Sequence, residues 1–126
     1  WRKIAECGMD GRVVLLGKKE NPYPYIVACD LYVQPSRYEG KCVAVREAQM
    51  LGKPVVITNY ATSASQLEDG VDGVIVPMKN QKCADGICDL LKNNGLLNTL
   101  VSNCQKRDYS NTSEVEKLYR ILKLEL

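Results

Sequence analysis

The stretch D-L-Y-V-Q-P-S-R-Y-E-G-K-C-V-A-V-R-E-A-Q-M-L-G-K-P-V-V-I-T, Asp30–Thr58, decides the fold of this chain of 126 residues. It opens with a short apolar run, Leu31–Val33, and closes with another, Pro54–Thr58, and both have the length of a strand. Between them a polar loop leads into a helical pattern, Cys42–Leu51, which Gly52 ends. A strand, a helix and a second strand in this order predict two parallel strands joined by a crossover helix.

The same alternation continues on both sides of this stretch. Further strands are predicted at Val13–Leu16, a run of apolar residues typical of a strand covered on both faces, and at Gly73–Pro77. The other helical patterns are Pro22–Cys29, Asn80–Lys92 with Asn80 as its cap, Asn94–Arg107, and a last helix opened by the capping box Ser113–Glu116. The sequence therefore predicts an α/β fold: a Rossmann-like, mostly parallel sheet with helices on both sides.

Charge and composition exclude several classes of protein. The 17 basic and 15 acidic residues give a net charge of +2, too balanced to predict a nucleic-acid partner. The apolar runs are far shorter than the roughly 20 residues that a membrane span needs. We therefore expect a cytoplasmic protein. The opening residues W-R-K-I-A-E-C resemble the end of a helix already under way, so we expect a segment of a longer chain.

The six cysteines form no C-x-x-C pair, and the chain has no histidine, so the sequence predicts no metal site. Their even number leaves three disulfides open as an alternative. Most of them stand beside apolar residues in helical patterns, which favours free thiols in a reducing compartment.

The start of the helix after the polar loop is a candidate anion site. Gly40 allows close approach of a ligand to the backbone, and the amides of Lys41, Cys42 and Val43 are expected to be unpaired in the first helical turn. With the helix dipole and the charge of Lys41, these amides suit a phosphate or a diphosphate. The alternative is an ordinary helix start with a solvated lysine.

Glu47 lies on the apolar face of the same helix, where a charged residue is not expected. On a helical wheel, Arg46 and Gln49 lie near Cys42 and define the polar face, whereas Glu47 falls inside the apolar arc. A carboxylate there needs a partner, either a buried basic residue or a ligand with hydroxyl donors. Glu47 lies roughly 7–8 Å along the helix from its start. That separation matches the span from the diphosphate of a nucleotide to its ribose, which favours the ligand.

Glu39 lies at the apex of the loop, just before the predicted phosphate site. It would face whatever is attached to the distal phosphate, and a sugar hydroxyl is a suitable partner. A solvated loop acid is the alternative.

These residues carry a resemblance to a known family. The stretch Asp30–Tyr60 resembles the C-terminal domain of the large family of retaining, GT-B-type glycosyltransferases, the glycosyl transferases group 1 or family 4. The signature is a Glu, seven residues, a second Glu, an Ala and a G-x-P-V strand, found here from Glu39 to Val55. The later D-G-V-D-G-V-I-V-P, Asp69–Pro77, and the earlier V-V-L-L-G, Val13–Gly17, match further parts of the same domain.

The resemblance implies a role for each candidate residue. Glu47 would bind the ribose, Glu39 would act at the transferred sugar as the catalytic residue, and the Gly40–Val43 amides would hold the diphosphate, with Tyr38 beside them. Gly17 and Lys18 would lie against the base. The family transfers sugars from nucleotide donors, often UDP or GDP sugars, to glycan or lipid-linked acceptors, and typically needs no metal or other cofactor.

The resemblance also implies what this chain lacks. The basic pair that grips the diphosphate in the family usually lies upstream, as do two strands and the N-terminal acceptor domain, so residues 1–126 are expected to be a partial donor-binding domain that is inactive alone. An uncovered strand edge is expected to allow dimerisation. Peripheral membrane contact is expected of the complete enzyme, because acceptors in this family are often membrane lipids. A non-catalytic Rossmann-like module and a sugar-nucleotide epimerase are the rival interpretations.

Overall fold

The structure is a computed structural model that describes residues 1–122. Its centre is a parallel sheet of three strands in the order β1 (Tyr32–Gln34), β2 (Val55–Thr58) and β3 (Gly73–Val76). The strands predicted after Asp30 are confirmed, each to within about one residue. All four residues of β2 are buried, because β2 is paired on both edges and covered on both faces.

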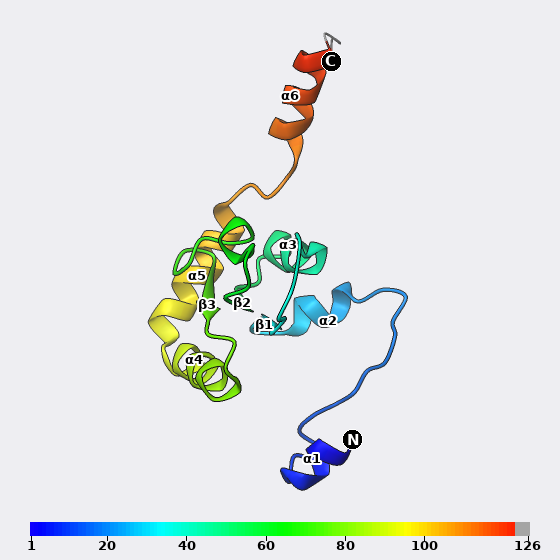
Figure 1. The fold of residues 1–126 in the computed structure, drawn as a ribbon, viewed down its shortest axis with the longest axis vertical. Coiled ribbons are helices and arrows are strands. Elements are labelled where there is room, and N and C mark those ends of the chain that lie inside the picture. Colours follow the sequence, from blue (N-terminus) through cyan, green and yellow to red (C-terminus); the bar gives the residue numbers. More distant parts are fainter. Residues whose placement is uncertain (123–126) are drawn as a thin grey trace.

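Helices cover both faces of this sheet, as predicted (Figure 1). On one face lie α2 (Tyr23–Ala28) and α3 (Val43–Met50), which pack Ile26, Val45 and Ala48 against Val55 and Ile57 of β2. On the other lie α4 (Asn80–Lys92) and α5 (Asn94–Lys106), whose core residues include Cys83, Leu90 and Leu100 and pack around Val56 and Val76. Alternate residues of β2 thus point into two separate cores, as the pleat of a strand requires.

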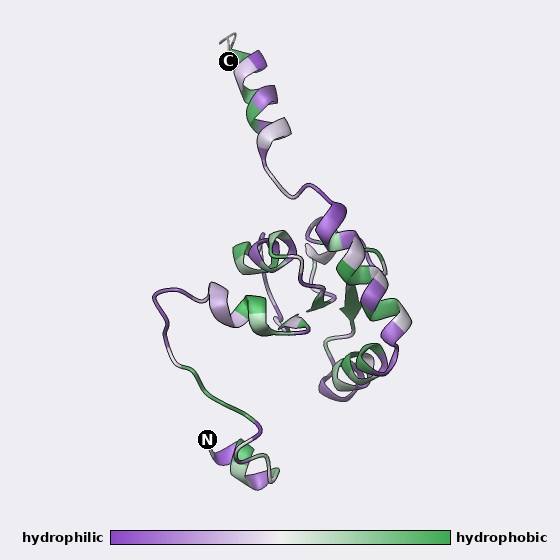
Figure 2. Ribbon diagram, turned by 180° about the vertical axis from the view of Figure 1, so that it is seen from behind, coloured by the Kyte–Doolittle hydropathy of each residue, from purple (hydrophilic) through white to green (hydrophobic). Residues whose placement is uncertain are grey.

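The prediction of a strand at Val13–Leu16 is wrong. After the short helix α1 (Arg2–Glu6), residues 14–19 have no regular structure, and the four apolar side chains of Val13–Leu16 are 41–70% exposed. This segment and α1, with the exposed Trp1, extend away from the sheet (Figures 1 and 2). An extended segment becomes a strand only when a neighbour completes its hydrogen bonds, and within residues 1–122 it has none.

The helix ends also differ in detail from the sequence predictions. Lys79, not Asn80, is the N-cap of α4, and α6 (Thr112–Leu122) begins before Ser113, so Ser113 lies inside the helix and forms no capping box there. A side-chain cap forms at the start of α5, where the Asn93 side chain accepts a hydrogen bond from the Leu96 amide at 3.0 Å. Gly52 ends α3 as expected, with a φ of 72° that favours glycine.

The six cysteines are all free, as the sequence predicted, and Cys83 and Cys104 are buried. No helix in residues 1–122 combines the length and apolarity needed to cross a bilayer. The last helix, α6, projects from the body with no buried residue (Figure 1).

Asp72, just before β3, holds several of these elements together. Its carboxylate is 1% exposed and accepts hydrogen bonds from Gln49 of α3 at 3.2 Å, from Tyr109 at 2.9 Å and from the Glu68 amide at 2.8 Å. Arg107, at the end of α5, completes the set with an ion pair at 3.1 Å. A buried carboxylate with this many donors is satisfied, whereas its donors would be orphaned without it.

We predict that Asp72→Ala lowers the free energy of unfolding by about 3 kcal/mol, the usual cost of removing one partner from a buried ionic cluster. Urea denaturation followed by circular dichroism measures the change. Asp89→Ala, at an exposed position of α4, is the matched control and is expected to change stability by no more than about 0.5 kcal/mol. Equal effects of the two substitutions would contradict the role given to Asp72.

We also predict that Gly73→Ala destabilises the protein. A Cβ at Gly73 would overlap the carbonyl oxygen of Val55 and lie 2.8 Å from Leu67 Cδ2, so the β2–β3 pairing would have to shift. Gly95→Ala in α5, where a Cβ has ordinary contacts, is expected to be neutral or to stabilise the helix by up to about 1 kcal/mol. Thermal unfolding of both variants provides the test, and a Gly73→Ala variant as stable as the native chain would contradict this packing.

Candidate functional site

The carboxyl edge of the sheet is shaped by the loop between β1 and α3. Thr58, at the end of β2, donates from its hydroxyl to the Ser36 carbonyl, and Thr62 donates to the carbonyls of Glu39 at 2.8 Å and Gly40 at 2.9 Å. Side chains from the end of β2 and from the segment after it therefore hold this loop through its backbone carbonyls. In open α/β sheets, ligands bind in the crevice at this edge, where loops meet helix N-termini.

Glu39 is fixed inside that loop and is not a freely solvated acid. Its residue is half-buried, and its Oε1 accepts hydrogen bonds from Ser36 Oγ at 2.7 Å and from Gln34 Nε2 at 3.3 Å. Gln34 is held in turn by Tyr32, whose hydroxyl donates to it at 2.9 Å. Burial raises the pKa of Tyr32, so this phenol keeps its proton and remains a donor. The carboxylate is thus oriented at the carboxyl end of β1 by neutral donors.

The start of α3 differs from its predicted form at one position. The Cys42 amide is not free, because it donates to the side-chain Oε1 of Gln66 at 2.9 Å. The prediction that this amide is unpaired is therefore wrong, since a buried glutamine caps the helix start from outside the helix. The Cys42 side chain provides no cap of its own.

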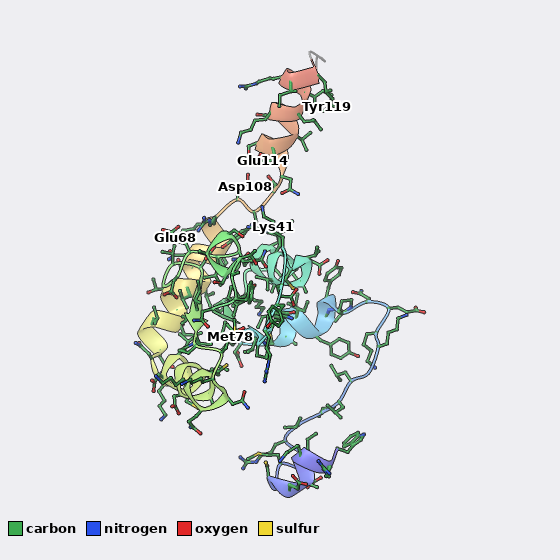
Figure 3. The ribbon with its side chains drawn as sticks, in the orientation of Figure 1. Lys41, Glu68, Met78, Asp108, Glu114 and Tyr119 are labelled. Atoms are coloured by element: carbon green, nitrogen blue, oxygen red, sulfur yellow. The ribbon has the colours of Figure 1, made fainter. Side chains whose placement is uncertain are left out.

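A cavity of about 240 Å³ opens beside this helix start, lined by Lys41, Cys42, Val43, Arg46, Gln66 and Asn111. Figure 3 shows Lys41 at the end of the body from which α6 projects. Arg46 is half-buried with its guanidinium 5.2 Å from the centre of the Tyr109 ring, and neither Lys41 nor Arg46 forms an ion pair within residues 1–122. The pocket therefore combines the positive end of the helix dipole with cations that an anion could approach.

Glu47 lies on the side of α3 that faces α2. Its residue is half-buried, and its Oε1 accepts a hydrogen bond from the Tyr23 hydroxyl at 2.8 Å. This contact raises the pKa of Tyr23, because the carboxylate holds the phenol proton. No basic residue pairs with Glu47 in the described part of the chain, and a cavity of about 300 Å³ opens beside it, lined by Tyr23, Glu47, Met50 and Leu51. The buried basic partner that the sequence left open is thus not found.

The rest of the helical wheel is partly corrected. Gln49, predicted on the polar face, is fully buried, because the Asp72 carboxylate offers it a partner inside the protein. Val43 and Met50, predicted in the apolar arc, are 68% and 60% exposed, because no described element covers that side of α3.

Three predicted site residues lie apart from this arrangement. Gly17 and Lys18 belong to the exposed segment before α2 that extends away from the sheet, so the structure does not bring them to α3 (Figure 1). Their expected place against a base depended on a strand at Val13–Leu16, which is not formed. Tyr38 stands on the loop, and its side chain is 92% exposed.

Sequence reasoning missed Gln66, Thr62 and Tyr23, which hold Cys42, the Glu39–Gly40 carbonyls and Glu47 respectively. Thr62 and Gln66 flank a single 3-10 turn, Ser63–Ser65, in a stretch with no hydrophobic period. The one available signal was the crossover topology, which places the segment after β2 beside the loop after β1.

Known proteins share this fold and sequence pattern. A galactosyltransferase of Escherichia coli, UDP-Gal:alpha-D-GlcNAc-diphosphoundecaprenol alpha-1,3-galactosyltransferase, is 24% identical over 92% of this chain and 30% of its own length. An N-acetylgalactosaminyltransferase of Campylobacter jejuni, which acts on N,N'-diacetylbacillosaminyl-diphospho-undecaprenol, is 31% identical over 74% of this chain and 25% of its own. The chain thus spans less than a third of these curated relatives.

The fold of this chain also resembles that of solved structures. HepE of Anabaena, crystallised in complex with UDP, superposes with a TM-score of 0.85 and 25% identity over 97% of this chain and 35% of its own. The family model for glycosyl transferases group 1 matches residues 1–93, well over half of the chain. With its parallel sheet, its loop–helix edge and this match, the chain belongs to the glycosyl transferases group 1 family.

Proposed function

We propose that this chain is the donor-binding part of a retaining glycosyltransferase. In this proposal the complete protein transfers a hexosyl group from a nucleotide-diphosphate sugar to a glycan or lipid-linked acceptor in the synthesis of a cell-surface polysaccharide. The names of the relatives support the acceptor class, since both act on diphospho-undecaprenol-linked sugars. The UDP in the HepE crystals supports the donor class. Contact of the complete protein with a membrane surface follows from a lipid-linked acceptor.

One observation carries the proposal: a single helix, α3, presents two complementary features, one at its N-terminus and one on its side. Its N-terminus opens on a cavity beside Lys41 and Arg46, and its side presents Glu47 to another cavity. A diphosphate suits the first environment, because the helix dipole and the cations oppose its charge. Ribose hydroxyls suit the second, because a carboxylate accepts hydrogen bonds from two vicinal hydroxyls.

The chemistry that follows is mainly electrostatic. As the bond between the sugar and the diphosphate breaks, negative charge grows on the leaving phosphate, and the dipole of α3 with Lys41 stabilises it. We propose that basic groups and this dipole, and not a metal ion, supply that stabilisation. Glu39 is held by Ser36 and Gln34 through Oε1, and we propose that its other oxygen, Oε2, accepts a hydroxyl of the transferred sugar.

We predict that Glu47→Gln weakens UDP binding by the complete protein roughly 10- to 100-fold, the usual value of a hydrogen bond to a charged acceptor. Calorimetry and the protection of the protein against heat by UDP or GDP measure the change, and Glu47→Ala is expected to abolish the protection. Glu116→Gln, at an exposed position of α6, is the control and should bind like the native protein. Undiminished binding by the Glu47 variants would rule out the ribose assignment. Binding of UDP without any sugar transfer would instead favour the non-catalytic module.

We further predict that the titration of Tyr23 reports on the same carboxylate. The pKa of Tyr23 is raised because its hydroxyl donates a hydrogen bond to the Glu47 carboxylate, so Tyr23 ionises at a higher pH than an isolated tyrosine. Glu47→Gln is expected to lower this pKa, and so is UDP, if the ribose takes the place of Tyr23 on Glu47. Ultraviolet difference titration of the native protein against Tyr23→Phe isolates the signal. A Tyr23 pKa that UDP leaves unchanged would contradict the displacement.

A further inference from the structure

A continuous set of hydrogen bonds crosses the interior from Asp72 to the start of α3. Gln49 Nε2 donates to Asp72 Oδ2 at 3.2 Å and lies 3.4 Å from the Gln66 carbonyl oxygen, to which it also donates. The side chain of Gln66 then accepts the Cys42 amide hydrogen through Oε1 at 2.9 Å. The set thus connects the buried carboxylate before β3 with the first turn of the helix that carries the proposed site.

These three polar side chains are almost fully withdrawn from water. Gln49 is 0% exposed, Asp72 1% and Gln66 4%. Water cannot replace a lost partner at such depth, so each hydrogen bond fixes the geometry of the next. Within residues 1–122 the Oε1 of Gln49 has no hydrogen-bond partner, which costs free energy, while its amide nitrogen donates to both acceptors. Gln66 is therefore held in one position by the protein before any ligand arrives.

The position of Gln66 decides which backbone groups face the cavity. Thr62, at the other end of the same 3-10 turn, donates hydrogen bonds to the carbonyls of Glu39 and Gly40. The two ends of this turn therefore hold the backbone on both sides of Lys41. With the Cys42 amide occupied, the amides of Lys41 and Val43 are left without a hydrogen-bond acceptor within residues 1–122. Gln66 also lines the cavity beside Lys41 and Arg46.

We propose that Gln66 is a positioning residue for the diphosphate of the donor. The inference rests on the proposed function and adds a residue outside the loop–helix motif. Gln66 acts through Cys42: by holding that amide, it sets the direction of the first turn of α3 and aims the neighbouring amides at the phosphates. The uridine part of the ligand, which meets Glu47 on the side of the helix, does not depend on it.

The test compares UDP with uridine in the complete protein. Gln66→Met keeps the volume and removes the acceptor, and it is expected to weaken UDP binding roughly tenfold while the affinity for uridine stays the same. Amide hydrogen exchange of Cys42 is expected to become roughly tenfold faster, because this amide loses its acceptor. NMR titration or calorimetry gives the affinities, and mass spectrometry gives the exchange.

Two further variants keep the test decisive. Gln66→Glu retains an acceptor, so exchange of the Cys42 amide should stay slow, while the added negative charge should weaken UDP and spare uridine. This variant serves alone if Gln66→Met does not fold. Gln81→Met, on the exposed face of α4, should behave like the native protein in every measurement.

The outcomes separate the two proposals. If the native protein binds no UDP, the proposed function fails, and the role of Gln66 fails with it. If the native protein binds UDP and both Gln66 variants bind it equally well, only the role of Gln66 is overturned. A parallel loss of UDP and uridine would also overturn it, because it would show a merely structural effect.

Discussion

The carboxylate of Asp72 is buried where water cannot hydrate it, and the surrounding elements meet because they must supply its hydrogen bonds. Gln49 reaches it from α3, Arg107 from the end of α5, and Tyr109 from the segment that follows. The two apolar cores lie on opposite faces of the sheet and would leave these elements free to shift. An apolar contact fixes distance but little direction, whereas a buried charge with several donors fixes both.

This constraint explains how a helix as short as α3 can carry the proposed site. Eight residues form too little helix to be stable in isolation, so its position depends on tertiary contacts. Val45 and Ala48 bind it to the core, and Gln49 ties its inner side to Asp72. The outer side, with Glu47, is thereby presented to the cavity beside Tyr23, and the N-terminus to the cavity beside Lys41. The arrangement is fixed by the fold itself, as the proposed stabilisation of developing charge requires.

Much of the fold could be predicted from the sequence, because strands and helices leave a local pattern of apolar residues. Short apolar runs predict the three paired strands, and the helical spacing of apolar residues predicts the helices between and after them. Gly52 predicts the end of α3. The side-chain partners could not be predicted in this way. Tyr23 and Gln66 each lie 24 positions from the residue they contact, and nothing near them marks the pairing. Gln49 is a polar residue, yet it is fully buried, because its hydrogen-bond partner Asp72 comes from another part of the chain. Val13–Leu16 has the composition of a strand, but strand formation also needs a neighbour.

The exposed Trp1 has a practical consequence for spectroscopy. It is the only tryptophan of the chain, it is 78% exposed, and it stands at the end of a segment that extends away from the sheet. Trp1 is already exposed to water in the native state. Its fluorescence is therefore expected to change little when the core unfolds. The rings of Tyr60 and Tyr109 are instead buried in the asymmetric surroundings of the folded protein. Near-ultraviolet dichroism of these tyrosines is therefore the optical signal that follows the folded body of this protein.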